Sequence, residues 1–433
     1  MIQINPREIA AEALMEIMTA DAYNTMTLRR LLRQNGAMSR QDRAFVTEVV
    51  NGTLRNLIYI DHVLNTFSKT KTEKMKPWLL AVLRTAVYQM YFMDVPDAAA
   101  CNEAVKLASV RGYGSLKGFV NGVLRTAAKK KQEIPLPERG TAEYLSVVYS
   151  HPLWLIRMWI AYYGYEETEQ ICAYDNQSPD VTIRVNTLKT NTQALKKKLE
   201  QAGVHVAEGR ICADALHLTK TADLSRLDAF KEGLFHVQDV SSMQVALTAA
   251  PKEGDICLDV CAAPGGKSLH LAELLHGTGL VEARDLTDYK VELIQDNIDR
   301  SELTNIRAVC HDATVLDESW IGKADIVLAD LPCSGLGVLN KKNDLKYRMT
   351  PEQQQVVDEA GQKAVEYERY INRSGANEIM NRWEEKNGVT FTAKEDMDID
   401  SFKEAVEGVD QWFVEELKNQ GYDDGQELVD AFK

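Results

Sequence analysis

Apolar residues recur at helical spacing through the first part of the chain. In the segment that begins at Pro77, apolar positions fall at i, i+3, i+4, i+7, i+8 and i+11, which predicts one buried helical stripe with proline in its first turn. Ser39 lies three residues before Asp42, a capping pattern for the stretch DRAFVTEVVNGTLR. Further helical runs cover 102–109 and 119–125. These patterns predict a compact all-α domain over residues 1–132.

The pattern becomes mixed after a linker. The charged sequence KKKQEIPLPERG, at 129–140, contains two prolines and has no periodicity. After it come a helical stretch that follows Trp154, a strand at 181–185, a helix at 192–202 and a strand at 215–218. Residues 133–245 are therefore expected to form a small α+β segment.

From Asp255 the chain alternates between short apolar runs and helical patterns. The expected strands are 256–260, 280–285, 306–312 and 325–330, with helices at 268–275 and 289–300. This alternation is typical of a parallel, doubly wound α/β sheet of the Rossmann type. We assign it to residues 246–350 and expect the sheet to be incomplete after its fourth strand. Residues 351–433 form an acidic tail, in which only 389–392 resembles a strand.

The negative charge is concentrated in that tail. The whole chain carries a formal net charge of −14, of which −12 belongs to 351–433 and −2 to the preceding 350 residues. The near-neutral part contains the lysine runs 129–131 and 196–198, which could contact phosphates. A lysine triplet is more often a solvated helix face, so the runs alone do not predict a nucleic-acid site.

Composition narrows the class of protein. No apolar run approaches the roughly 20 residues of a membrane span, and the N-terminus has no signal-peptide pattern. A cytoplasmic protein with no membrane partner is expected. The seven cysteines form no CxxC pair, which argues against a zinc site or a disulfide framework. Most of them are expected to be small buried apolar residues.

A turn rich in small residues follows the first strand of the α/β region. Asp259 ends that strand and the chain continues as CAAPGGKS, residues 261–268. A strand, a glycine-bearing turn and a helix start place backbone N–H groups beside a ligand. Acids stand at or near the ends of all four strands: Asp259, Asp285, Asp312 and Asp330. One such acid often only caps the next helix, but four in succession favour a nucleoside-bearing cofactor.

The sequence of this turn also bears on the type of cofactor. GxGxxG is absent, which argues against NAD. Residues 261–268 differ from the P-loop pattern GxxxxGK[ST] only at Cys261, so an NTPase is a minority alternative. Pro264 removes one N–H that a P-loop would use to hold phosphate.

The loop after the fourth strand reads DLPCSGLG, with Cys333 directly after Pro332. Amine methyltransferases commonly carry an aromatic residue at this position. A thiolate suits C5 of a pyrimidine instead, because its addition at C6 makes C5 nucleophilic toward a methyl donor. Asp330 is placed to hydrogen-bond the base. The alternative is that Cys333 is only a small residue in a crowded turn.

These segments together resemble the RNA 5-methylcytosine methyltransferase family, and within it the bacterial members that modify 16S ribosomal RNA. The resemblance covers roughly residues 5–352. The segments that carry it are DVCAAPGGKS, ADLPCSGLG, NDLKYRMTPEQ, QDRAFVTEVVNGTLR, LRTAVYQM, CNEAVKLA, FVNGVLR, SHPLWLIRMW, TIRVNTLK and FHVQDVSS.

The resemblance implies a NusB-like N-terminal domain and RNA contacts from both upstream parts. It implies ribosomal RNA as the partner and no DNA. It also implies that S-adenosylmethionine is held by the following residues: Cys261, Ala262, Ala263, Pro264, Gly265, Gly266, Lys267, Asp285, Asp312 and Asp330.

The tail departs from this family. There the attacking cysteine belongs to a Thr-Cys motif after the fifth strand, and the cysteine matched by Cys333 assists product release. No cysteine follows Cys333 in this sequence. The charge shift near Glu352 suggests a junction of unrelated sequences, through a frameshift, a fusion or a chimeric assembly. Three functions remain open: a methyltransferase that uses Cys333 as nucleophile, an inactive protein that binds cofactor or RNA, and the NTPase.

Overall fold

The computed structural model describes residues 5–20, 22–177, 180–209, 211–219, 224–387, 414–415 and 418, with side chains of the long helix described as far as Ile371. The chain divides into two units, residues 1–354 and 355–433. The expected strand at 389–392 lies outside the described residues.

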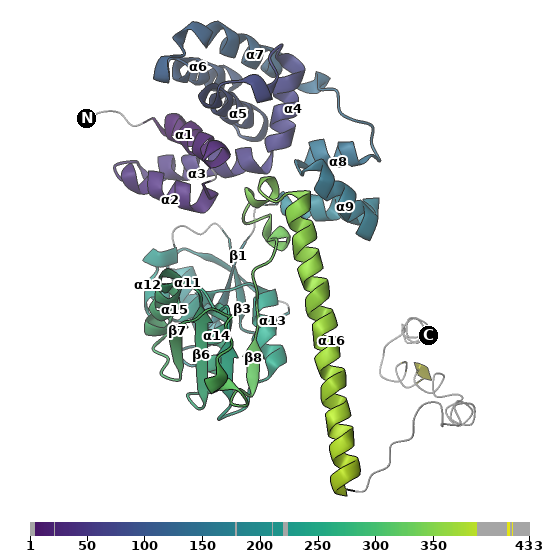
Figure 1. The fold of residues 1–433 in the computed structure, drawn as a ribbon. Coiled ribbons are helices and arrows are strands. Elements are labelled where there is room, and N and C mark those ends of the chain that lie inside the picture. Colours follow the sequence, from purple (N-terminus) through teal and green to yellow (C-terminus); the bar gives the residue numbers. More distant parts are fainter. Residues whose placement is uncertain are drawn as a thin grey trace, which may run out of the picture. The chain divides into compact units, whose positions relative to one another are not determined.

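The N-terminal part is helical, as the periodicity predicts (Figure 1). Its α-helices are α1 (Pro6–Thr19), α2 (Asn24–Gln34), α3 (Arg40–Arg55), α4 (Leu57–Phe67), α5 (Pro77–Phe92), α6 (Asp97–Leu107) and α7 (Lys117–Lys129). The Ser39 cap is confirmed, because its hydroxyl oxygen accepts a hydrogen bond from the Asp42 N–H at 3.1 Å. Helix α6 begins earlier than expected, directly after Pro96, whose ring restricts the preceding backbone.

The buried stripe predicted for helix α5 is confirmed, because all six of its apolar positions are buried, and burial also extends to other sides of the helix. Trp78, Ala81 and Arg84 lie outside the i, i+3, i+4 pattern and are nevertheless buried. The helix packs against α1, α3, α4, α6 and α7, so several of its faces meet a neighbour. The Arg84 guanidinium donates two hydrogen bonds to the Asp61 carboxylate, at 2.8 and 2.7 Å, which satisfies the buried charge.

The second part begins with three helices, α8 (Ala142–Tyr149), α9 (Leu153–Tyr163) and α10 (Tyr165–Asp175). A four-stranded antiparallel sheet follows in the order β2-β3-β1-β4. Its strands are β1 (Val181–Val185), β2 (His205–Glu208), β3 (Ala215–Thr219) and β4 (Phe235–Val237), with α11 (Thr192–Gln201) and α12 (Asp228–Lys231) between them. Helix α11 and the apolar side chains of the sheet form one small core.

The third part is the predicted parallel sheet, in the order β7-β6-β5-β8. It contains β5 (Ile256–Asp259), β6 (Leu280–Asp285), β7 (Ile306–Cys310) and β8 (Ile326–Leu328), with α13 (Val240–Ala249), α14 (Gly266–Leu274) and α15 (Asp288–Ser301). Among the described residues no strand pairs with the outer edge of β8. Val327 on that strand is 58% exposed, so β8 is an open edge of the described sheet.

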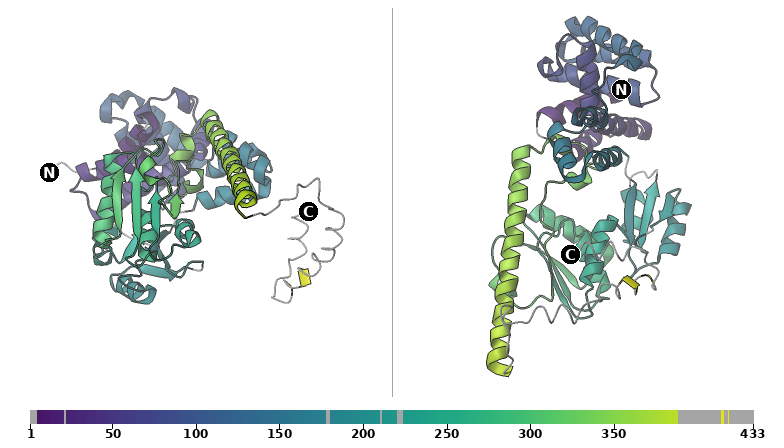
Figure 2. Two further views of the ribbon diagram at one scale, coloured as in Figure 1. Left: turned by 60° about the horizontal axis from the view of Figure 1, so that its bottom comes forward. Right: turned by 90° about the vertical axis from the view of Figure 1, so that its right-hand side faces the viewer.

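Helix α16 (Pro351–Asn387) follows the third part and is helical over 37 residues (Figure 2). The helix-leaning composition of the start of the tail is therefore confirmed. No described helix of the chain is both long and apolar enough to cross a membrane.

A short segment before α16 joins the third part to the first two. The Asp344 carboxylate accepts a hydrogen bond from the Asn24 N–H at 3.1 Å, and Lys346 donates to the Arg55 carbonyl at 2.9 Å. The Tyr347 hydroxyl lies within hydrogen-bond distance of the carbonyls of Leu54 and Ser150. Residues 344–348 thus hydrogen-bond to backbone groups of both the first and the second part of the chain.

We expect Gly52→Ala to destabilise the helical domain, because an added Cβ would lie 1.9 Å from Cζ of Tyr88. Such overpacking costs about 1–3 kcal/mol. The matched control is Gly122→Ala on α7, where a Cβ would meet nothing within 4 Å, and the better helix propensity of alanine should add about 0.5–1 kcal/mol. Thermal unfolding checks both variants, and equal melting temperatures would contradict the close Gly52–Tyr88 packing.

Burial of Lys346 predicts a pH-dependent stability. Burial lowers the pKa of Lys346 to about 7, against the raising effect of Asp175 and Cys172, while Arg55 lowers it further. In the unfolded chain the pKa returns to its ordinary value of 10.5. Between these values the unfolded state binds more protons, so the contribution of Lys346 to stability rises with pH.

The measurement is the free energy of unfolding in urea, for the wild type and Lys346→Met, at pH 7 and pH 8.5. The difference between the two proteins should change by about 1 kcal/mol per pH unit, in favour of the wild type at the higher pH. Because other titrating groups are common to both proteins, their effects cancel. A difference independent of pH would show that Lys346 stays charged in the fold.

Candidate functional site

The turn after β5 is built on a buried carboxylate. Asp259 is 1% exposed and accepts hydrogen bonds from the Ser268 hydroxyl at 2.6 Å and from the Cys261 N–H at 3.3 Å. Burial raises the pKa of Asp259, and these two hydrogen bonds oppose the rise. Because Ser268 lies in the first turn of α14, the carboxylate joins the end of the strand to the start of the helix.

Asp285 holds the other side of the same turn. Its carboxylate accepts hydrogen bonds from the N–H groups of Ala263 at 3.0 Å and Leu286 at 2.8 Å, and from the Lys290 ammonium at 2.8 Å. Burial alone would raise the pKa of Asp285, but these three hydrogen bonds outweigh it and lower the pKa below its ordinary value. Asp285 is therefore an ionised acceptor at the carboxyl end of β6.

Backbone geometry explains the first of the two glycines of the turn. Gly265 has a φ of +101°, in the region that favours glycine, and its N–H donates to the Ala262 carbonyl at 2.6 Å. Helix α14 begins at the next residue, Gly266, so its first N–H groups lie at the carboxyl edge of the sheet. The Asn297 side-chain amide donates to the Pro264 carbonyl at 2.9 Å and fixes the turn against α15. Strand, turn and helix are arranged as the sequence predicted.

The two later acids lie beyond their strands. Strand β7 ends at Cys310 and β8 at Leu328, so Asp312 and Asp330 each follow the strand end by two residues, and the predicted ends were too late. The cause at Asp312 is local: its carboxylate accepts hydrogen bonds from the N–H and the hydroxyl of Thr314, which turns the chain. Both side chains are exposed.

Lys267 forms an ion pair with Asp330. In a P-loop the corresponding lysine extends toward phosphate groups. Here it joins the β5 turn to the loop that carries Cys333.

Cys333 is an exposed free cysteine on the loop after β8. The loop is kept tight at Gly335, which has a φ of +72° and where a Cβ would lie 2.9 Å from the Leu345 side chain. All seven cysteines are free. Four of them are buried, as predicted for most: Cys101, Cys172, Cys212 and Cys257.

A buried polar cluster that was not predicted from the sequence lies behind this site. Arg184 on β1 and Glu273 on α14 are each 1% exposed at their side chains and form an ion pair, with one hydrogen bond of 3.1 Å from Nη2 to Oε1. The Arg184 Nε donates to the Gln238 side-chain carbonyl at 2.6 Å, and His236 Nε2 lies 3.0 Å from Glu273 Oε1. The cluster connects the antiparallel sheet to the helix that begins at the turn.

Burial and the charge of Arg184 act in opposite directions on the pKa of Glu273 and in the same direction on the pKa of His236. Burial raises the pKa of Glu273, but Arg184 and His236 outweigh it and the pKa is lowered. Burial lowers the pKa of His236, with Arg184 acting in the same direction. The sequence feature that could have predicted this cluster is the alternation in TIRV, which places Thr182 and Arg184 on one face of a strand.

The two lysine runs are largely paired with acids of this chain. Lys131 binds Asp97, Lys196 binds Glu208 at 2.8 Å, and Lys198 binds Glu232. These pairs support the interpretation of the runs as solvated, charge-compensated faces.

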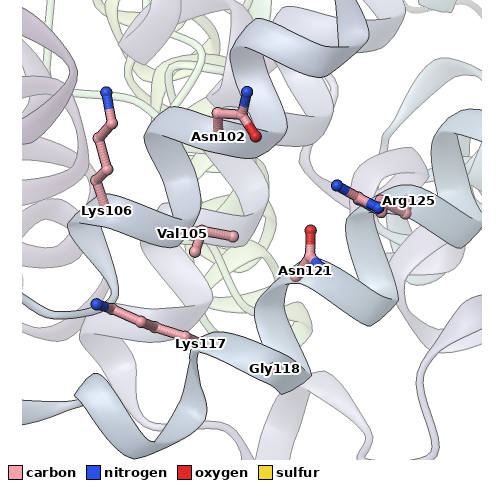
Figure 3. A pocket seen from close by; sticks show the side chains of 7 residues that line it. All are labelled: Asn102, Val105, Lys106, Lys117, Gly118, Asn121 and Arg125. Atoms are coloured by element: carbon pink, nitrogen blue, oxygen red, sulfur yellow. The ribbon is translucent and has the colours of Figure 1, made fainter.

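A more cationic surface lies between α6 and α7, around a hollow of about 470 Å³. Asn102 and Asn121 face the hollow, with Lys106 and Lys117 toward one end and Arg125 toward the other (Figure 3). The lining includes no acid, although Lys106 binds the neighbouring Glu103 at 2.6 Å.

We expect Ser268→Ala to destabilise the turn after β5, because it removes the hydroxyl donor of a buried carboxylate. The loss should amount to about 1–3 kcal/mol. Ser319 offers a matched control, since its hydroxyl donates to Asp317 at the same 2.6 Å but in an exposed turn. Urea denaturation of Ser319→Ala should differ little from the wild type; equal losses in both variants would contradict the role of burial.

The helical domain, the antiparallel α+β segment and the parallel sheet with a glycine turn define a three-part, Rossmann-like methyltransferase. Three family models match successive regions: the NusB family at 4–129, the ferredoxin-like domain of the RsmF/B-like methyltransferases at 151–225, and the 16S rRNA methyltransferase RsmB/F family at 246–366. The last match continues past Glu352 into α16, so the departure from the family begins later than the sequence analysis placed it.

Relatives in bacteria match over most of the chain. The probable ribosomal RNA small subunit methyltransferase B of Bacillus subtilis is 38% identical over 356 residues, which cover 81% of this chain and 78% of the relative. The Synechocystis protein of the same name is 32% identical and covers 80% and 78%. The crystal structure of PH0851 aligns with a TM-score of 0.68 at 26% identity, over 84% of this chain and 83% of the other. This chain belongs to the ribosomal RNA small subunit methyltransferase B family.

Proposed function

We propose that this protein uses S-adenosylmethionine to methylate C5 of a cytosine in 16S ribosomal RNA. The single observation that carries the proposal is the site at the carboxyl edge of the parallel sheet. There the Asp259–Lys267 turn, the ionised Asp285 and the Cys333 loop are joined by the Lys267–Asp330 ion pair. The names of the relatives support ribosomal RNA as substrate. That substrate also favours action in the cytoplasm.

The donor and acceptor set fits this cofactor. The first N–H groups of α14 and the Lys267 ammonium suit a carboxylate, as in the amino-acid part of S-adenosylmethionine. Asp285 is an ionised acceptor suited to ribose hydroxyls, and Asp312 is an exposed acceptor for the amino group of an adenine. Residues 261–266 would then contact the cofactor mainly through their backbone. When bound, the cofactor would supply an electrophilic methyl group.

Cys333 is the residue proposed to activate the base. Its thiolate would bond to C6 of the cytosine, which shifts the electron pair of the C5–C6 double bond onto C5. Asp330, three residues earlier, would hydrogen-bond the base and help to polarise the ring. After methyl transfer, the C5 proton would pass to solvent water, and the C5–H electron pair would restore the double bond and release the thiolate. This assignment differs from the family pattern, in which a second cysteine attacks and the Pro-Cys cysteine assists release.

One observation favours a second candidate function, in which the protein binds cofactor or RNA without turnover. No cysteine follows Cys333 in the sequence, and the described sheet has no fifth strand after β8. The Thr-Cys motif of the family therefore has no counterpart in this chain.

Methyl transfer to unmodified 16S ribosomal RNA tests the proposal. With methyl-labelled S-adenosylmethionine, the wild type should place label in 5-methylcytidine, and Cys333→Ser should lose about 1,000-fold or more in rate. Cys310→Ser, also at an exposed cysteine, should retain the wild-type rate. Label in any other nucleoside, or a fully active Cys333→Ser variant, would contradict the assignment.

Calorimetry separates the remaining functions. Asp285→Ala should weaken S-adenosylmethionine binding about 10- to 100-fold, because it removes hydrogen bonds to a charged acceptor. Asp299→Ala, on the exposed face of α15, should bind as the wild type does. Cofactor binding without label in cytosine would establish the non-catalytic function. Binding of ATP with no binding of S-adenosylmethionine would establish the NTPase instead.

The hollow between α6 and α7 is the surface of the helical domain that best suits the RNA backbone. Lys106, Lys117 and Arg125 provide cations, and Asn102 and Asn121 provide amide donors. Cationic and amide groups are the usual partners of phosphate oxygens.

A further inference from the structure

The antiparallel sheet of the second part has one apolar and one polar face. In β1 and β3 the apolar side chains Ile183, Leu216 and Leu218 belong to the small core with α11. The alternate positions are polar except Ala215, and two of them, Thr182 and His217, are direct register partners. The Thr182 hydroxyl lies 3.2 Å from His217 Nδ1. A polar sheet face of this kind needs a polar partner or solvent.

Only part of this polar face is covered by the third part of the chain. Arg184 and His236 pack against Glu273 of α14, as described above. The pair Thr182 and His217 instead lines an open pocket of about 420 Å³. That volume is within the range typical of sites for small molecules, about 300–1,000 Å³.

The remaining walls of the pocket come from three other regions. Tyr174, 61% exposed, and Gln177 lie at the end of α10. Asp239 lies at the start of α13, directly after Gln238 of the buried cluster. Asn340 and Lys341 follow the Cys333 loop. Cys333 itself is not part of the lining, whereas Gly337 and Val338, which follow it on the same segment, are.

The charges of the lining argue against a phosphate group. Lys341 is the only lysine or arginine in the lining, and it forms an ion pair with Asp239. Asp180 adds a second acid, so the pocket has an excess of negative charge. An exposed aromatic ring together with amide, hydroxyl and imidazole groups is the set that binds an unstacked nucleobase through its face and its edge.

We propose that this pocket binds a nucleobase that flanks the target cytosine in the RNA strand. The base stacks on Tyr174, and its exocyclic amino group donates to the Asp180 carboxylate. Cytosine, adenine and guanine carry such an amino group, whereas uracil does not, so uracil is disfavoured. The assignment rests on the proposed function, because it takes the substrate to be RNA. It identifies the second part of the chain as a contributor to sequence preference.

Fluorescence anisotropy with labelled 12-nucleotide RNAs tests the subsite. We expect the wild type to bind oligo(C) and oligo(A) more tightly than oligo(U). Tyr174→Ala should weaken oligo(C) binding about 5- to 100-fold, the loss typical of one stacked base. Asp180→Ala should remove the preference over oligo(U). Both side chains are exposed, so neither variant should disturb folding.

The matched control is Tyr162→Ala on α9, where the tyrosine is 73% exposed and outside the pocket lining. This variant should bind every RNA as the wild type does. If the wild type binds RNA and Tyr174→Ala binds equally well, the subsite is overturned and the proposed function stands. If the wild type binds none of the RNAs, the proposed RNA substrate is itself overturned. Equal losses in the Tyr162→Ala and Tyr174→Ala variants would also overturn the subsite.

Discussion

The buried ion pair between Arg184 and Glu273 is the contact on which the arrangement of the two candidate sites depends. Two buried charges are expensive to remove from water, and they persist only when each is fully hydrogen-bonded. Arg184 donates hydrogen bonds to Glu273 and Gln238, and the charge of Glu273 is compensated by Arg184, with His236 Nε2 3.0 Å away. Loss of one partner would leave the other charge buried and uncompensated. The antiparallel sheet is therefore fixed to α14, the helix that begins at the glycine turn.

This connection gives the second part a role beyond that of a linker. The chain passes from Gln238, which contacts Arg184, to Asp239, which pairs with Lys341 beyond the Cys333 loop. The glycine turn is linked to the same loop through Lys267 and Asp330. A short path of polar contacts thus joins the proposed cofactor turn, the cysteine loop and the proposed base pocket.

At the β8 edge of the parallel sheet, this chain differs from the pattern that the family resemblance implies. Family membership is shown by similarity over most of the sequence, and the match to the RsmB/F family continues to residue 366. Strand β8 is nevertheless the last strand of the described sheet, and the sequence has no cysteine after Cys333. The proposed cofactor site uses the carboxyl edges of β5 to β8, whereas the Thr-Cys nucleophile implied by the family resemblance would require one strand more. In this proposal, binding and turnover depend on different parts of the domain.

Local sequence determined much of this protein. Helical and alternating periodicities predicted all three architectures, and the pattern DVCAAPGGKS predicted a strand, a turn and a helix that the structure contains. Such features depend on residues within one or two turns of each other, so a single sequence can predict them. Only the tertiary structure decided which distant charges meet. The Arg184–Glu273 pair spans 89 positions, and the buried Lys346 meets the Arg55 carbonyl across 291. Pairing over such distances follows from how whole elements pack, which periodicity does not encode.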